Sequence, residues 1–117
     1  MSRDDATLLD IAKAARLVLE FKQGFDRIAF LNDAKTQSAI LHQLLILGES
    51  IKRLSDEFRA RHPQIPWRLI AGMRDKLIHD YDDVDLDEVW RVAERDIPQL
   101  IQLIEPLLPT RGRNTDD

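Results

Sequence analysis

Apolar residues recur at steps of three and four positions in several stretches of the chain, which is the spacing of one face of an α-helix. Residues 4–22 form the first of these stretches. Gly24 interrupts the pattern, and residues 25–32 are typical of a connection or a short helical turn. The pattern resumes over residues 33–54, so two long helices are predicted in the first half of the chain.

The second predicted helix carries a wider apolar arc than one core-facing stripe requires. Two explanations account for this arc: a central helix with several neighbours, or a helix that also contributes to a homodimer interface. The pattern favours neither. The residues of the arc are Ile40, Leu41, Leu44, Leu45, Leu47, Gly48, Ile51 and Leu54.

Proline and a capping pattern delimit two further helices. Pro66 ends a helix-breaking segment and suits the first position of a new helix, so a third helix is predicted over residues 66–79. Asp85 followed by Glu88 has the spacing of a capping box. This spacing predicts a fourth helix over residues 86–108.

No segment alternates apolar and polar residues over the length of a strand, so the predicted fold is all-α. The simplest architecture is an antiparallel four-helix bundle. Its fourth helix is expected to kink at Pro98, whose nitrogen cannot donate to the carbonyl of Glu94. Residues 1–108 form the expected domain, and residues 109–117 are expected to be a mobile C-terminal tail.

Composition narrows the class of protein. The 117 residues suffice for one domain, and 44% hydrophobic with 32% charged residues is typical of a folded helical protein. The absence of cysteine excludes disulfides, thiolate metal sites and a cysteine nucleophile. With no signal-peptide or membrane-span pattern, the chain is expected to be soluble and cytoplasmic. A net charge of −4 counts against broad attraction of nucleic acid, although a local basic cleft is compatible with it.

Arg74, His79 and Tyr81 are the residues with the clearest chemical potential. On a continuous helix Arg74 and Tyr81 share a face, whereas His79 lies about 140° around the axis from Arg74. A helix that ends at about residue 78 would let His79 and Tyr81 turn back beside Arg74.

These three side chains suit the cleavage of RNA without a metal. The ribose 2′-hydroxyl supplies the nucleophile, His79 acts as base or acid, and Arg74 stabilises charge on the phosphate. Tyr81 donates to phosphate or positions His79. From spacing alone, however, a surface ion pair or a capping group is the commoner explanation of such residues.

A family resemblance strengthens the chemical interpretation. Residues 74–81, Arg-Asp-Lys-Leu-Ile-His-Asp-Tyr, match the R-x-x-x-x-H-x-Y signature of HepT-like toxins of the HEPN superfamily. Segments around this motif resemble the same family in order and spacing, and the resemblance covers nearly all of residues 4–108. The flanking segments are residues 48–54, 61–67, 70–74 and 84–90.

The resemblance implies a four-helix HEPN bundle that forms a homodimer, with the motif residues of both copies facing one cleft. It implies a toxin that is a metal-independent endoribonuclease, with Arg74 and His79 catalytic and no cofactor. It also implies a partner, a minimal nucleotidyltransferase antitoxin of the MntA type. Tyr81 resembles the hydroxyl to which that enzyme attaches AMP, and this AMPylation would place negative charge in the cleft meant for RNA.

Glu49 belongs to the Gly-Glu segment of the second helix and is a candidate supporting residue. It would face the cleft and orient Arg74 or His79. An exposed ion pair with Arg53, four residues further along the helix, is an equally consistent explanation.

An acidic run after the motif departs from what an RNA-binding rim should look like, and it comprises Asp80, Asp82, Asp83, Asp85 and Asp87. Part of it matches the ligand spacing of a calcium loop. Glu88, however, stands where the tight turn of such a loop needs glycine, and the segment already predicts a helix start. No metal site is expected.

Three functions remain open at this point. The first is the ribonuclease toxin. The second is a non-catalytic HEPN binding module that accepts nucleotides or binds a nucleotidyltransferase partner, which the acidity near the motif favours. The third is a dimerisation unit, which leaves Arg74 and His79 unexplained.

Overall fold

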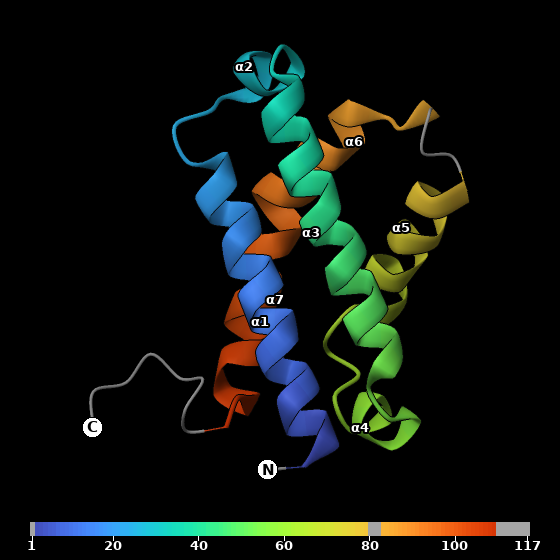
Figure 1. Cartoon of the computed structure of the whole chain (residues 1–117). Coiled ribbons are helices and arrows are strands. Elements are labelled where there is room, and N and C mark those ends of the chain that lie inside the picture. Colours follow the sequence, from blue (N-terminus) through green and yellow to red (C-terminus); the bar gives the residue numbers. More distant parts are fainter. Residues whose placement is uncertain (1, 80–82, 110–117) are drawn as a thin grey trace.

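The computed structural model describes residues 2–79 and 83–109, and within these ranges it contains helices and no strand. Four long helical segments run alternately in opposite directions (Figure 1), which confirms the predicted all-α antiparallel bundle. They are α1 (Arg3–Lys22), α3 (Ala34–Arg53), α5 (Trp67–His79) and a composite segment of α6 (Leu86–Arg91), a π-helical turn (Val92–Asp96) and α7 (Ile97–Ile104). The shorter elements are α2 (Arg27–Leu31), α4 (Asp56–Arg61) and a 3₁₀ turn (Glu105–Leu107).

Local signals explain where α1 begins and ends. The Ser2 side chain accepts a hydrogen bond from the Asp5 backbone nitrogen at 3.0 Å, and the Asp5 carboxylate accepts from the Ser2 nitrogen in return. This capping box satisfies two amide donors that a helix start leaves unpaired. Just beyond the other end, Gly24 has a φ of +84°, a conformation that residues with a Cβ rarely adopt.

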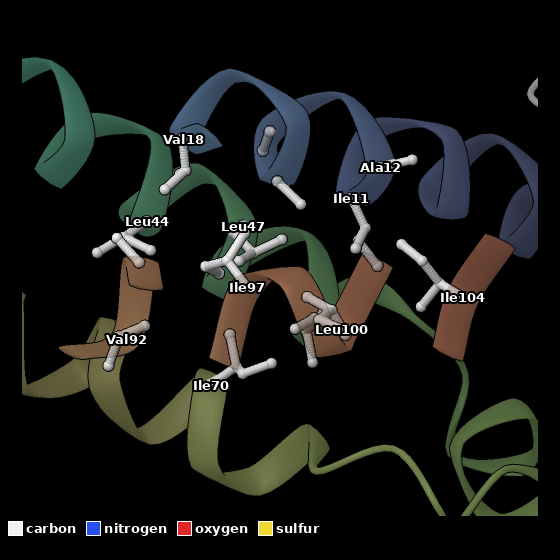
Figure 2. Close-up of a cluster of buried hydrophobic side chains, with 14 of the residues drawn as sticks. Ile11, Ala12, Val18, Leu44, Leu47, Ile70, Val92, Ile97, Leu100 and Ile104 are labelled. Atoms are coloured by element: carbon white, nitrogen blue, oxygen red, sulfur yellow. The ribbon is translucent and has the colours of Figure 1, made fainter. Parts of the chain in front are cut away.

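Helix α3 is the centre of the bundle, with α1 on one side and α5 on the other (Figure 1). Side chains from α1, α3, α5 and α7 point into one shared core in Figure 2, among them Leu44, Ile70 and Leu100. Most of the wide apolar arc of α3 is buried by neighbours in the same chain, namely Ile40, Leu41, Leu44, Leu47, Gly48 and Ile51. Burial within one chain therefore accounts for the arc, and no second copy is needed to explain it.

Helix α4 was absent from the sequence prediction. Its N-cap Ser55 accepts a hydrogen bond from the Phe58 nitrogen at 3.0 Å. The Asp4 carboxylate, at the start of α1, accepts hydrogen bonds from the Ser55 nitrogen and hydroxyl at 3.0 and 2.8 Å. These bonds hold the pKa of Asp4 below its usual range. The start of α1 is thereby tied to the segment that connects α3 to α5.

The fourth helical segment begins where the sequence predicted. Asp85 accepts hydrogen bonds from the nitrogens of Asp87 and Glu88 at 3.0 and 3.3 Å. The second half of the predicted capping box is not formed, because the Glu88 carboxylate pairs with Arg91 instead.

Pro98 is accommodated by a change in helix type just before it. The Ile97 nitrogen bonds to the Val92 carbonyl, five residues back, at the end of the π-helical turn. Pro98, which has no amide donor, is then the second residue of α7, directly after this wider turn.

No described helix combines the length and the apolar character needed to cross a bilayer. Of the predicted C-terminal tail, residues 110–117 lie outside the described part of the chain.

Candidate functional site

Arg74 lies where α5 crosses α3, and Gly48 makes that crossing possible. A Cβ placed on Gly48 would lie 2.2 Å from the Arg74 Cβ and 2.8 Å from its Cγ. Real Cβ atoms do not approach other carbons so closely. The missing side chain at Gly48 therefore lets the two helices touch at the residue that begins the motif.

The terminal nitrogens of the Arg74 guanidinium contact two carboxylates. Nη1 donates to Asp75 Oδ1 at 3.2 Å, and Nη2 lies 3.8 Å from Glu49 Oε2. The Arg74 side chain is 24% exposed, so its stem is shielded while its end reaches the surface. Its Nε is buried and has no hydrogen-bond partner among the described residues.

Helix α5 includes His79, one residue beyond the end considered for it, so His79 itself keeps its helical direction. Arg74 and His79 therefore leave the helix axis about 140° apart, as expected for a continuous helix. His79 is exposed, and no hydrogen bond or ion pair joins it to Arg74 in the described part of the chain. Tyr81, the third predicted site residue, lies outside the described residues.

Asp75 links the two predicted catalytic residues in space. Asp75 and His79 are four residues apart on one helix, so their side chains leave the same face one turn apart. The long Arg74 side chain bends toward this face, because its Nη1 bonds to Asp75. The guanidinium is thus directed toward the side of α5 from which the His79 side chain leaves, although Arg74 itself leaves the helix in a different direction.

Asp75 also accepts a hydrogen bond from the Lys52 ammonium, which the sequence analysis did not single out. The bond from Lys52, followed by the bond from Arg74, holds the pKa of Asp75 below its usual range. Asp75 is thus an ionised carboxylate between two cations. No sequence pattern indicated this arrangement, because Lys52 belongs to a different helix.

Glu49 takes the first of the two positions considered for it. Its carboxylate pairs with Arg74, while Arg53 lies 3.6 Å from Asp10 and donates to the Ser50 hydroxyl at 3.1 Å. Within the described ranges, no ion pair joins Glu49 to Arg53. The surface around the guanidinium therefore carries Glu49 and Asp75 as its anions and Lys52 as its second cation.

The acidic run after the motif has structural uses where it is described. Asp85 caps α6, and Asp87 Oδ1 accepts a hydrogen bond from Arg27 Nε at 2.7 Å. Asp80 and Asp82 lie outside the described residues. In the part of the chain that the structure describes, no group of three histidine or acidic side chains is placed to hold a metal ion.

A small cavity lies beside the motif helix, between α5 and the start of α6. It is lined by residues that include Met73, Leu77, Val84 and Val89, and its volume is about 30 Å³. This volume corresponds to about one water molecule. The cavity is too small for a nucleobase, and neither Arg74 nor His79 lines it.

The chain is similar to known proteins over almost its whole length. The family model described as ribonuclease HepT-like matches residues 11–107. A relative from Thermococcus cleftensis, described as "probable ribonuclease HepT", is 45% identical over 100 residues, which are 86% of this chain and 91% of the relative.

Two further relatives are both described as "putative RNase". One, from Methanocaldococcus jannaschii, is 34% identical over 103 residues, which are 88% of this chain and 85% of the relative. The other, from Caldanaerobacter subterraneus subsp. tengcongensis, is 36% identical over 98 residues, which are 84% of this chain and 88% of the relative. No solved structure matches the chain. The family match and these relatives agree with the all-α bundle and its motif helix: the chain belongs to the HepT-like ribonuclease family.

Proposed function

We propose that this protein is a metal-independent endoribonuclease, the toxin of a toxin–antitoxin pair, whose catalytic residues are Arg74 and His79. One observation carries the proposal. In a chain of the HepT-like ribonuclease family, a partly shielded guanidinium bonds to Asp75, which lies one helical turn before an exposed histidine on α5. A guanidinium and an imidazole on one accessible face suit phosphodiester cleavage.

The reaction uses a nucleophile that the substrate supplies. The ribose 2′-oxygen attacks the adjacent phosphorus, the bond from phosphorus to the 5′-oxygen of the next nucleotide breaks, and a 2′,3′-cyclic phosphate forms. One proton leaves the 2′-hydroxyl and one is delivered to the departing 5′-oxygen. His79 takes part in this proton transfer, and Arg74 stabilises the charge that accumulates on the phosphate oxygens.

Before the phosphate can bind Arg74, it must compete with Glu49 and Asp75, the carboxylates that contact the guanidinium. Both are exposed enough for water to screen these ion pairs, with side-chain exposures of 60% and 47%. A phosphate that accepts two parallel hydrogen bonds from a guanidinium forms the stronger interaction. Glu49 then keeps the guanidinium near the surface while the site is empty.

A homodimer completes this site in our proposal. A single chain leaves His79 exposed, and the cavity beside α5 has room for about one water molecule, so water has free access to the reacting groups. A second copy placed against this face would enclose a cleft between two motif helices. Exclusion of water from such a cleft strengthens the interaction between Arg74 and the phosphate.

Cleavage in the absence of metal tests the proposed reaction. The purified protein is expected to cleave transfer RNA or total RNA in EDTA, because the 2′-hydroxyl, Arg74 and His79 supply all the chemistry. After the cleavage position has been mapped, an oligonucleotide with a single 2′-deoxynucleotide on the 5′ side of that bond is expected to resist cleavage. The matched all-RNA oligonucleotide is the control.

Two outcomes would contradict the reaction. Cleavage of the 2′-deoxy oligonucleotide at the same bond would show that the 2′-hydroxyl is not the nucleophile. Activity that requires added Mg²⁺ would show that a metal does the work assigned to Arg74. Absence of any cleavage would favour the second candidate, a binding module that accepts nucleotides, which the two carboxylates on the Arg74 guanidinium also favour.

The proposed antitoxin is a minimal nucleotidyltransferase that attaches AMP to Tyr81. Incubation of the protein with such an enzyme and ATP is expected to add nucleotide mass to Tyr81 and to abolish RNA cleavage, since each added phosphate brings negative charge to a phosphate-binding face. Intact-protein and peptide mass spectrometry measure the adduct. Tyr81→Phe is the matched control: it should remain unmodified, and its own rate of RNA cleavage should be the same before and after incubation with the enzyme and ATP. An adduct elsewhere, or full activity of the modified protein, would contradict the proposal.

A further inference from the structure

One oxygen atom of Asp75 is shared by two cations. Arg74 Nη1 donates to Asp75 Oδ1 at 3.2 Å, and the Lys52 ammonium donates to the same atom. A guanidinium from α5 and an ammonium from α3 therefore converge on a single anionic oxygen. Both cations therefore bind an anionic oxygen at this place, and the backbone phosphates of an RNA strand are ligands of the same kind.

Lys52 is free to exchange Asp75 for another anion. Its side chain is 40% exposed, against 24% for Arg74, so water screens its ion pair more strongly. Exposed pairs of this kind contribute little to folding. The position of Lys52 is therefore poorly explained by stability alone, whereas it suits an exposed anionic ligand.

Lys52 also borders a second feature of the surface. A hollow of about 530 Å³ lies where the start of α1, the end of α3 and the start of α4 meet, and Lys52 is one of its lining residues. The hollow is lined by four basic side chains and two carboxylates, so it is locally positive although the net charge of the chain is −4. The charged lining residues are Arg3, Lys52, Arg53 and Arg59, with Asp4 and Asp56.

Both carboxylates of the hollow already have partners. Asp4 accepts two hydrogen bonds from Ser55, and Asp56 pairs with Arg59. Arg53 has an acidic neighbour outside the hollow, Asp10, at 3.6 Å. Lys52 therefore belongs to both places, because it lines the hollow and also donates to Asp75, the carboxylate that accepts from Arg74.

We infer that Lys52 binds a backbone phosphate of the RNA next to the phosphate held by Arg74, and that the strand continues from there across this hollow. This inference rests on the proposed ribonuclease function and adds a substrate-binding residue to it. Lys52 acts on affinity and on the path of the strand. Arg74 and His79 act on the reacting phosphate.

The salt dependence of RNA binding measures the contact directly. In a His79→Ala background, which holds RNA without cleaving it, replacing Lys52 by alanine is expected to weaken binding of a labelled single-stranded RNA. The slope of log K against log salt is negative, and it should become shallower by about 0.7, which is the value for one phosphate contact on a single strand. Lys52→Arg should restore both quantities.

Kinetics and a matched lysine separate binding from other effects. With His79 present, Lys52→Ala is expected to raise KM and to leave the single-turnover rate at saturating RNA largely unchanged. Lys35→Ala is the control, because Lys35 is exposed on the same helix, about 25 Å away. It should alter neither the slope nor KM.

Asp75→Asn distinguishes phosphate binding from a purely structural role. If Lys52 served only to hold Asp75, Asp75→Asn would weaken RNA binding as much as Lys52→Ala does, and that result would overturn the inference. The inferred contact predicts instead that Asp75→Asn binds RNA at least as tightly, with an unchanged slope. If Lys52→Ala keeps the parental slope and the parent protein cleaves RNA, the inference about Lys52 fails but the proposed function stands. If the parent protein neither binds nor cleaves RNA, the proposed function fails as well.

Discussion

Replacing His79 by alanine is expected to lower the rate of RNA cleavage by about 10²–10⁴-fold, the range that a positioned acid or base supplies. The fold should be unaffected. His79 is exposed, and substitutions at such positions usually change stability by less than about 0.5 kcal/mol. Single-turnover cleavage in EDTA measures the rate, and circular dichroism with thermal unfolding checks the fold.

Arg74→Ala is expected to lower the rate by about 10²–10³-fold through loss of charge stabilisation on the phosphate. Arg74→Lys should recover only part of this loss, because an ammonium keeps the charge without the fork of two parallel donors. Arg68→Ala is the matched control, since Arg68 is an exposed arginine of the same helix. Cleavage at the parental rate by both His79→Ala and Arg74→Ala would exclude this face of α5 as the active site.

Gly48→Ala is expected to destabilise the protein by about 1–3 kcal/mol, although alanine is the better helix former. The added Cβ would lie 2.2 Å from the Arg74 Cβ, so α3 and α5 must move apart. The same movement displaces Arg74, and RNA cleavage should fall with stability. The midpoint of urea unfolding and the single-turnover rate measure the two effects.

Gly72→Ala is the control for helix propensity, because a Cβ on Gly72, in α5, meets no other atom within 4 Å. This substitution should stabilise the protein by about 0.5–1 kcal/mol. Arg74→Gly removes the Cβ with which the new Cβ of Gly48→Ala would clash. The double variant should therefore be more stable than the sum of the two single effects predicts. Equal unfolding midpoints for Gly48→Ala and Gly72→Ala would refute the close approach.

The long helices could be predicted because each carries its own signals. The apolar spacing of residues 33–54 led to a helix that the structure places at Ala34–Arg53, and Asp85 marked the start of α6 by its capping side chain. Helix α4 has six residues, too few for a periodic pattern. Its available signal was Ser55, a favoured N-cap residue, three positions before the buried Phe58.

The motif of the site could be predicted, but its surroundings could not. Arg74 and His79 are close in sequence, so their spacing is visible in the chain. Gly48 and Lys52 contribute through the crossing of α3 and α5, which no local pattern encodes. Helix α5 ends one residue later than the turn considered at residue 78, so His79 is still helical, and the long Arg74 side chain bends toward Asp75 without such a turn.

The contact between Gly48 and Arg74 also limits how this protein can change over generations. The Cβ and Cγ of a proposed catalytic residue are here one half of a helix-packing contact, so a single position is selected for chemistry and for folding at once. A side chain gained at Gly48 would be tolerated only after a compensating loss at Arg74, and that loss removes the guanidinium. Under the proposed toxin function, variants that survive production of the protein should therefore include changes at Gly48, a position outside the proposed catalytic residues.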